Sequence, residues 1–228
     1  MRAWSGPAGT APADGAGTRL FGVYPAIVEA LVDPDGLGRV EVSLPWLGDR
    51  DGDGAVTAWA TLVTPYADED QGLEIVPEKG SQVLVAFEAG DARRPYVLGA
   101  CWNGRARLPE APTAANDKRV LRTREGSLLE FDDRKGAPKV TLRTKAGHVV
   151  ELDEGARQVT VRHAGGCSVV LTSSQVQVTA NGTVEVNASA VNVHAPAATF
   201  DGTVSCTTLN ASVAVMSPMY SQGAGNVW

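Results

Sequence analysis

Two sets of arginine, glutamate and aspartate recur at the same spacing in this sequence, and residues of these types can do acid–base chemistry. They lie in RTREGSLLEFDD, residues 122–133, and in RTKAGHVVELDE, residues 143–154. A positioned carboxylic acid near other charged groups is a common proton-transfer device. Catalysis seldom needs the same set twice, so we interpret both as salt bridges at the corners of a repeated hairpin: Arg122, Glu130 and Asp132 in the first, and Arg143, Glu151 and Asp153 in the second.

A third copy of this segment has lost its acids. It reads RHAGGCSVVLTS from Arg162, and it keeps the arginine and the glycine but has Val170 and Thr172 where the acids stand. In the rest of the sequence only Glu185 and Asp201 are charged. This loss of charge indicates a shaft that becomes slimmer and more regular along the chain.

Other patterns suggest metal binding but lack essential ligands. GDRDGDGAV places Asp49, Asp51 and Asp53 at the first positions of a calcium loop, but Ala60 stands at the twelfth position, where a glutamate is needed. We interpret this segment as an acidic, solvated loop. The histidines and cysteines are widely spaced, so we expect no metal, cofactor or redox site. The histidines, His148, His163 and His194, stand alone. We expect the cysteines to be small buried apolar residues: Cys101, Cys167 and Cys206.

Charge and hydropathy exclude several classes of function. The net charge is -6 at pH 7, and no basic face is available for nucleic acid or basic amphipathic helix for a membrane surface. No stretch approaches the roughly 20 apolar residues of a membrane span, and the first residues do not resemble a signal peptide. We therefore expect assembly in the cytoplasm.

The first half of the sequence predicts a small barrel. Residues 1–18 are rich in Gly, Ala and Pro and should be flexible. Between residues 19 and 103, five strand-like segments separated by turn residues predict a closed barrel of the OB type, with Trp46 and Trp59 filling its core.

The second half predicts a shaft that needs more than one chain. A Pro/Ala linker at 104–117 precedes short alternating strands from 118 to 216, in which valine pairs recur at regular spacing. Each strand can turn about two valines inward, and about 1.5–3 kcal/mol per side chain does not offset the backbone entropy of the ordered residues. Three chains around one axis would bury these valines. The fold class is therefore all-β, with an OB barrel followed by an intertwined trimeric β-helix or β-prism.

The C-terminal segment, 217–228, differs from the shaft. Pro218 stops strand pairing, and large side chains appear in a region otherwise built from small ones. We predict that this tip binds a partner through Met216, Met219, Tyr220 and Trp228.

Specific segments then suggest a family. GRVEVSLPW, WATLVTP and PEKGSQVLVAFEAGDARRPYVLGACWNG resemble the OB domain of phage baseplate assembly protein V and of VgrG-type spikes, and RTREGSLLEFDDRKG resembles the neck of their trimeric β-helix. The resemblance implies a non-enzymatic, homotrimeric central spike of a contractile injection machine, such as a phage tail, a tailocin or an extracellular injection system. Such a spike sits on the baseplate hub and pierces the target envelope when the sheath contracts.

The resemblance also sets expectations about partners. Longer VgrG proteins carry hub domains ahead of the OB domain, and here we expect the hub to be a separate protein. Some phage spikes end in an iron-binding HxH motif, which this sequence lacks. A blunt trimeric end would leave backbone groups unpaired, so we expect a separate cone protein of the PAAR type to cap the tip.

Two other interpretations remain open. A trimeric fibre or adhesin that recognises a receptor would have a similar valine- and threonine-rich shaft, but the barrel at the front argues against it. A β-helix enzyme that degrades polysaccharide would need longer coils and a groove of acids and bases, whereas residues 163–228 hold only Glu185, Asp201 and His194 as candidates.

Overall fold

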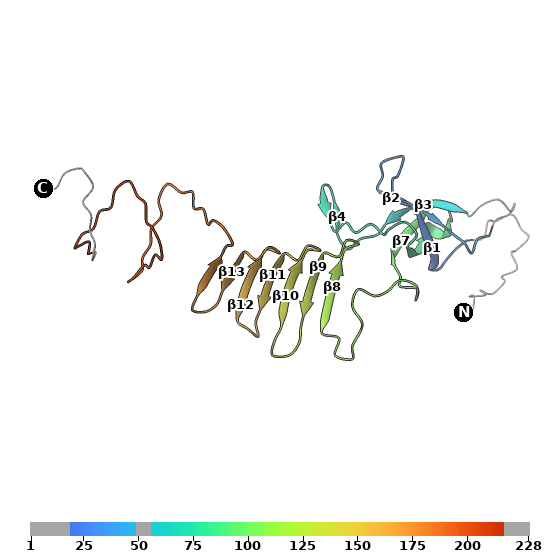
Figure 1. The fold of residues 1–228 in the computed structure, drawn as a ribbon. Helices are drawn as coiled ribbons and strands as arrows, with labels where there is room; N and C mark the ends of the chain where they lie inside the picture. Colours follow the sequence, from blue (N-terminus) through green and yellow to red (C-terminus); the bar gives the residue numbers. More distant parts are fainter. Residues whose placement is uncertain (1–18, 49–55, 217–228) are drawn as a thin grey trace, which may run out of the picture. The chain divides into compact units, whose positions relative to one another are not determined.

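The computed structural model describes residues 19–48 and 56–216. Within these ranges the chain is all-β, as predicted, and its single helical turn is the 3-10 element η1 (Glu88–Gly90). Figure 1 shows the strands of a barrel and of a second sheet, which ends at β14. The segment expected to be flexible, the candidate calcium-loop residues Asp49, Asp51 and Asp53, and the tip segment 217–228 lie outside the described residues.

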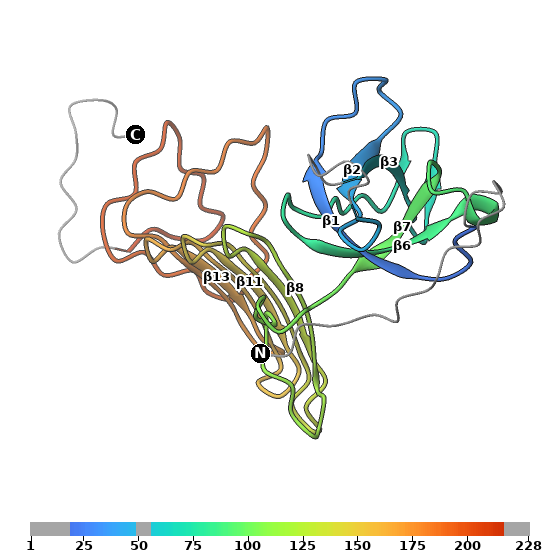
Figure 2. The same ribbon diagram turned by 90° about the vertical axis from the view of Figure 1, so that its right-hand side faces the viewer.

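A closed five-stranded barrel forms in the first half, which confirms the predicted OB-type fold. The strands follow the order β1-β2-β3-β7-β6, and β6 pairs back to β1 to close the barrel (Figure 2). All pairs are antiparallel except the parallel pair of β3 and β7. The barrel strands are β1 (Tyr24–Ala30), β2 (Arg39–Ser43), β3 (Thr57–Leu62), β6 (Gln82–Phe87) and β7 (Pro95–Ala100).

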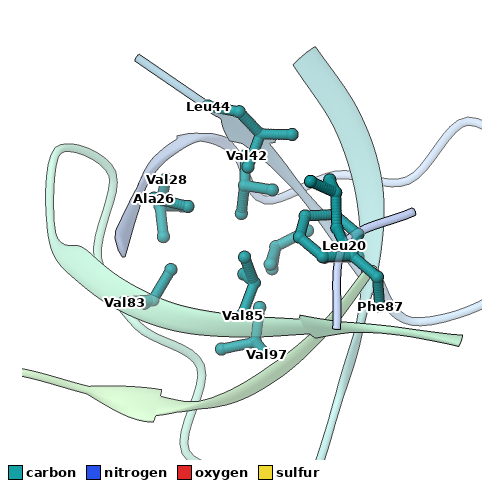
Figure 3. Packing of buried hydrophobic residues seen from close by; sticks show 11 residues of the cluster. Leu20, Ala26, Val28, Val42, Leu44, Val83, Val85, Phe87 and Val97 are labelled. Atoms are coloured by element: carbon teal, nitrogen blue, oxygen red, sulfur yellow. The ribbon is translucent and has the colours of Figure 1, made fainter. Parts of the chain in front are cut away.

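The barrel core consists of alternate residues along these strands, because successive side chains of a strand point to opposite faces. Figure 3 shows their side chains pointing toward one another. At one end of the barrel Trp46 stacks on Tyr24, and its indole Nε1 donates a 2.7 Å hydrogen bond to the Pro25 carbonyl. The buried cluster comprises Leu20, Ala26, Val28, Val40, Val42, Leu44, Ala60, Val83, Val85, Phe87 and Val97.

One predicted core residue lies elsewhere. Trp59 was expected inside the barrel, but its neighbour Ala60 is the buried residue of β3, so Trp59 points to the other face and is half-buried. There the Arg39 guanidinium lies 5.9 Å from the centre of its ring. Cation–π contact of this kind suits a tryptophan at a surface.

A short hairpin that the sequence did not predict lies between β3 and β6. It consists of β4 (Ala67–Asp68) and β5 (Gln71–Gly72), which pair only with each other. The Tyr66 hydroxyl and the Gln71 side-chain oxygen lie 2.6 Å apart across its base, where they share a hydrogen bond.

The second sheet is an antiparallel meander of seven strands. Its order, β14-β13-β12-β11-β10-β9-β8, follows the sequence without a crossover, and Figure 1 shows neighbouring strands side by side. The strands are β8 (Lys118–Arg122), β9 (Leu128–Asp132), β10 (Lys139–Arg143), β11 (Val149–Asp153), β12 (Gln158–Arg162), β13 (Ser168–Leu171) and β14 (Val176–Thr179).

The three copies of the repeated segment form the same turn. In each copy the first turn residue pairs with the residue four positions later, and a glycine amide donates back to that first residue. These glycines, Gly126, Gly147 and Gly166, have φ values of 90, 91 and 101°. Side chains rarely tolerate this region, which explains why the glycine persists in the third copy after the acids are lost.

Residues from Ala180 onward form a separate unit. In its described part, 180–216, no strand is assigned, and the valine pairs expected to lie inside a shaft are exposed in the single chain, for example Val193 at 72%. The predicted β-helix is therefore only partly present in one chain: the meander represents it up to Thr179.

Candidate functional site

One face of the meander carries two continuous rows of apolar side chains. The strand register has no shift from β8 to β14, so residues that lie opposite each other form straight rows across the sheet. Two of these rows share a face because they are two residues apart on every strand. They contain Phe131, Val140, Leu152, Val159, Leu171 and Val176, and Leu121, Leu129, Leu142, Val150, Val161, Val169 and Val178.

Much of this apolar face is left exposed by residues 19–48 and 56–216, the part of the chain that the structure describes. Leu121 and Leu142 are each 52% exposed, and Val161 is 47% exposed. Monomeric proteins rarely expose a contiguous apolar surface spanning a whole sheet. The face is therefore a candidate assembly surface, and we call it the apolar face.

The opposite face, which we call the polar face, contains paired charges, and its apolar residues Leu128 and Val149 are buried. Lys139 lies 2.6 Å from Asp153 and 3.4 Å from Glu151, and Lys118 lies 3.4 Å from Glu130. The hydrogen bond with Asp153 raises the pKa of Lys139 and lowers that of Asp153. Such half-exposed ion pairs hold the polar face in water and favour its outward orientation.

The predicted arginine–acid sets are not brought together within one chain. In the register Asp132 lies opposite Lys118, whereas Arg122 lies opposite Leu128 at the other end of the same strand pair. The Asp132 carboxylate instead accepts a hydrogen bond from Arg134, which lowers its pKa. The second set is divided in the same way, since Arg143 lies opposite Val149 and Asp153 opposite Lys139.

Two histidines expected to stand alone are neighbours. The rings of His148 and His163 lie 4.4 Å apart between centroids, because they flank the paired ends of β11 and β12. The Nδ1 atoms accept backbone hydrogen bonds from Ala164 and Gly165, respectively. The signal in the sequence is their place beside paired strand ends: His148 directly precedes Val149, His163 directly follows Arg162, and these two residues are paired. Among the described residues, no group of three or more His, Cys, Asp or Glu could hold a metal ion.

The exposure of the cysteines and of one predicted tip residue can be compared with the sequence predictions. Cys101 is half-buried, but Cys167 and Cys206 are exposed in the single chain, so burial was the wrong expectation for these two at this level of assembly. Met216 is 92% exposed. The other predicted tip residues, Met219, Tyr220 and Trp228, lie outside the described residues.

The barrel carries a second candidate surface. A groove of about 960 Å³ lies between the barrel wall and the β4–β5 hairpin. Its lining includes exposed apolar side chains, such as Leu73 and Ile75, and carboxylates of Asp68, Asp70 and Glu74. This groove suits a segment that carries both apolar and basic side chains.

Comparison with known proteins shows which proteins the barrel resembles. Residues 24–102 match the family described as type VI secretion system/phage-baseplate injector OB domain. The chain is 28% identical over 134 residues to the type VI secretion system spike protein VgrG3 of Vibrio cholerae, in an alignment covering 57% of this chain and 13% of that protein. It is 26% identical over 137 residues to spike protein VgrG4b of Pseudomonas aeruginosa, covering 57% and 17%.

A third relative carries a further activity in its name. The chain is 27% identical over 113 residues to the actin cross-linking toxin VgrG1 of Vibrio cholerae, covering 47% of this chain and 10% of that protein. In each case the chain spans less than a fifth of the relative's length. Within the described residues, the protein has no helix with the length and apolar character to cross a membrane.

Proposed function

We propose that this chain is the structural central spike of a contractile injection machine, because residues 24–102 match an injector OB domain and the chain resembles VgrG spike proteins. Three copies form the spike, the barrels seat it on a hub, and the shaft is driven through a target envelope when a sheath contracts. The machine is a phage tail, a tailocin or an extracellular injection system, and the spike is assembled in the cytoplasm before it joins the baseplate.

The apolar face is the observation that carries this proposal. Three sheets with their apolar faces toward one axis form a closed prism that excludes water from both rows of side chains. Since these side chains are already partly covered, we estimate that the gain is on the order of 10 kcal/mol per chain. A closed trimer also leaves no lateral sheet edge available for aggregation.

Residues 180–216 support the same arrangement. Their valines alternate with polar residues as in a strand, but none of this segment is assigned to a strand in one chain. Buried backbone groups need hydrogen-bond partners, and neighbouring copies of the same segment would supply them in a trimer.

In this proposal the groove of the barrel is the surface that binds a hub protein. Its carboxylates and exposed apolar side chains form a mixed surface on the barrel. We assign the hub contact to this surface, and the capping of the tip by a PAAR-type protein to Met216 and the segment that follows it.

A non-enzymatic role agrees with the chemistry of the sheet. The acids of the repeated sets are held by neighbouring cations: Lys139 binds Glu151 and Asp153, and Arg134 binds Asp132. The pKa values of Asp132 and Asp153 are lowered by these hydrogen bonds, so both are poor general acids at neutral pH. Two of the relatives, VgrG3 and VgrG4b, are named as spike proteins, which supports a structural role.

The mass of the purified protein tests the proposal. Light scattering should give three times the chain mass of 23.8 kDa, and the trimer should persist on dilution. In the producing cells, a tagged chain should copurify with sheath and tube proteins, and deletion of its gene should abolish killing by the particles. A stable monomer would rule out the spike.

A further inference from the structure

The ends of the strands form two sides of the meander that differ chemically, and we call these sides its edges. Because consecutive strands run in opposite directions, every turn falls on one of these two edges (Figure 1). On the arginine edge, β8, β10 and β12 end in Arg122, Arg143 and Arg162. On the acid edge, β9 and β11 end in Asp132 and Asp153 and are followed directly by Asp133 and Glu154.

The three arginines have no counter-charge in their own chain. All three are exposed, and within the described residues none of their side chains takes part in a hydrogen bond or an ion pair. The other charges of this edge are satisfied: Lys145 lies 2.6 Å from Glu125, and Arg124 lies 3.0 Å from Glu78. The arginine edge therefore presents a column of like charges.

The acid edge has two carboxylates to offer. Asp132 and Asp153 are occupied by Arg134 and Lys139. Asp133 and Glu154 are exposed, and in the described part of the chain their carboxylates have no partner. The cations Lys135 and Arg157 lie on this edge as well, in the same connections as Asp133 and Glu154, but no ion pair joins them to these acids in the described part of the chain.

The free arginines and the free acids lie at alternating positions along the direction in which the strands are stacked, and we call such a position a level. Neighbouring strands are about 4.8 Å apart, so the arginines of β8, β10 and β12 are separated by about twice that distance. The acids follow β9 and β11. Asp133 thus lies midway in level between Arg122 and Arg143, and Glu154 midway between Arg143 and Arg162.

Threefold symmetry brings these edges together. If the apolar faces point to a common axis parallel to the stack, rotation places the arginine edge of each copy against the acid edge of the next and leaves every level unchanged. We infer that each corner of the trimer is closed by ion pairs between copies, in which Arg122 and Arg143 of one copy bind Asp133 and Glu154 of the next. This inference depends on the trimer proposed above.

The same pattern selects the direction of the chains. Turning one sheet end over end, with its apolar face still inward, would exchange its two edges and place an arginine edge against an arginine edge. Like charges in contact disfavour such a neighbour. The corners therefore favour three parallel copies, with all barrels at the same end of the spike.

Charge reversal in the full-length protein tests this pairing. We expect Arg122→Glu/Arg143→Glu to lower the trimer association constant by on the order of a hundredfold, because two contacts are lost at each of three corners. Asp133→Arg/Glu154→Arg should have a similar effect. The protein with all four changes should return to within about threefold of wild type. Arg105→Glu/Arg107→Glu, an equal charge change on two exposed arginines outside the sheet, should leave association unchanged.

Disulfide trapping provides a test that does not depend on stability. In a protein with Cys101, Cys167 and Cys206 replaced by serine, Arg143→Cys/Glu154→Cys places two thiols at opposite ends of neighbouring strands, more than about 10 Å apart and too far for a bond within one chain. We expect oxidation to give covalent trimers on a non-reducing gel. Each single substitution should give none.

The outcomes separate this inference from the proposed function. A wild-type trimer whose reversal variants associate normally, or whose four-residue variant is not rescued, would overturn the corner pairing alone. Absence of covalent trimers from a trimeric double-cysteine protein would do the same. A wild-type chain that stays monomeric would overturn both.

Discussion

Both carboxylate oxygens of Asp33 accept hydrogen bonds from Arg39, at 2.8 Å from Nε and 2.9 Å from Nη2. The Asp33 side chain is only 3% exposed, and it also accepts hydrogen bonds from the backbone amides of Asp35, Leu37 and Arg39. One carboxylate thus fixes the connection between β1 and β2, where Gly36 has a φ of 67°.

Removal of this carboxylate should destabilise the barrel. Asp33→Ala removes both hydrogen bonds between Arg39 and Asp33 and leaves three backbone amides without their acceptor, so we expect the melting temperature of the barrel to fall by about 5 °C. Tryptophan fluorescence reports the transition through Trp46. Asp35→Ala serves as the control, because Asp35 makes one ion pair with Arg39 from an exposed position. An equal loss in both variants would contradict the central role of Asp33.

The same contact should make barrel stability depend on acid pH. Arg39 holds the pKa of the Asp33 carboxyl well below its usual value of 3.8. A group with a lowered pKa stabilises the folded state above its unfolded pKa, and this contribution is lost as pH falls toward the folded pKa. We expect the wild-type melting temperature to fall below about pH 4, and Asp33→Asn to show a shallower decline.

A second aspartate provides the comparison for this pH series. Hydrogen bonding to Arg93 lowers the pKa of Asp91 to about 2, but the Asp91 side chain is 34% exposed. Asp91→Asn should therefore reduce the dependence of the melting temperature on pH less than Asp33→Asn does. Parallel curves for wild type and Asp33→Asn would show that Asp33 does not control the acid transition.

A charge on the apolar face should block assembly. Val161→Lys places an ammonium group in the proposed prism core and removes the burial of three valines, which costs about 5 kcal/mol per trimer before the charge itself is considered. Thr160→Lys is the matched control, since Thr160 lies next in sequence on the polar face, opposite Glu151. Sedimentation velocity should show monomers for Val161→Lys and trimers for Thr160→Lys. Trimers of both variants would exclude the apolar face as the interface.

The tip can be tested by deletion. We expect the full-length protein to capture a PAAR-type protein encoded nearby and deletion of residues 217–228 to weaken capture at least tenfold, on the order of a lost hot-spot residue. Deletion of residues 1–18 is the control for loss of a terminal segment. If the full-length protein binds no such protein, the cap is absent; if the truncated protein binds equally well, the docking surface lies before Pro218.

The sequence predicted most of the barrel and the strands of the meander because alternation with period two is a strong signal. It missed β4 and β5, since two-residue strands have no periodicity to detect. The position of Trp59 was wrong for another reason: alternation identifies a strand but does not say which of its faces is inside, and here Ala60 takes the inner position.

The candidate site shows the same limit. Comparison of the repeats identified Arg122 and Asp132 correctly as a recurring set, but sequence copies do not show which residues meet. Counting outward from the turn that contains Gly126 places Arg122 beside the turn and Asp132 at the far end of β9. The same count from the next two turns brings His148 opposite His163. The partners that we propose for the free charges lie on neighbouring copies, and a pattern within one chain does not identify such partners.

The uninterrupted order of β8 to β14 also has a kinetic consequence. Each strand of the meander pairs with the strand made just before it, across a connection of a few residues, and such local contacts form quickly. The barrel instead closes only when Tyr24 meets Val85 in β6. The meander therefore needs only local contacts once neighbouring copies cover its apolar face, whereas closure of the barrel needs a long-range contact within one chain.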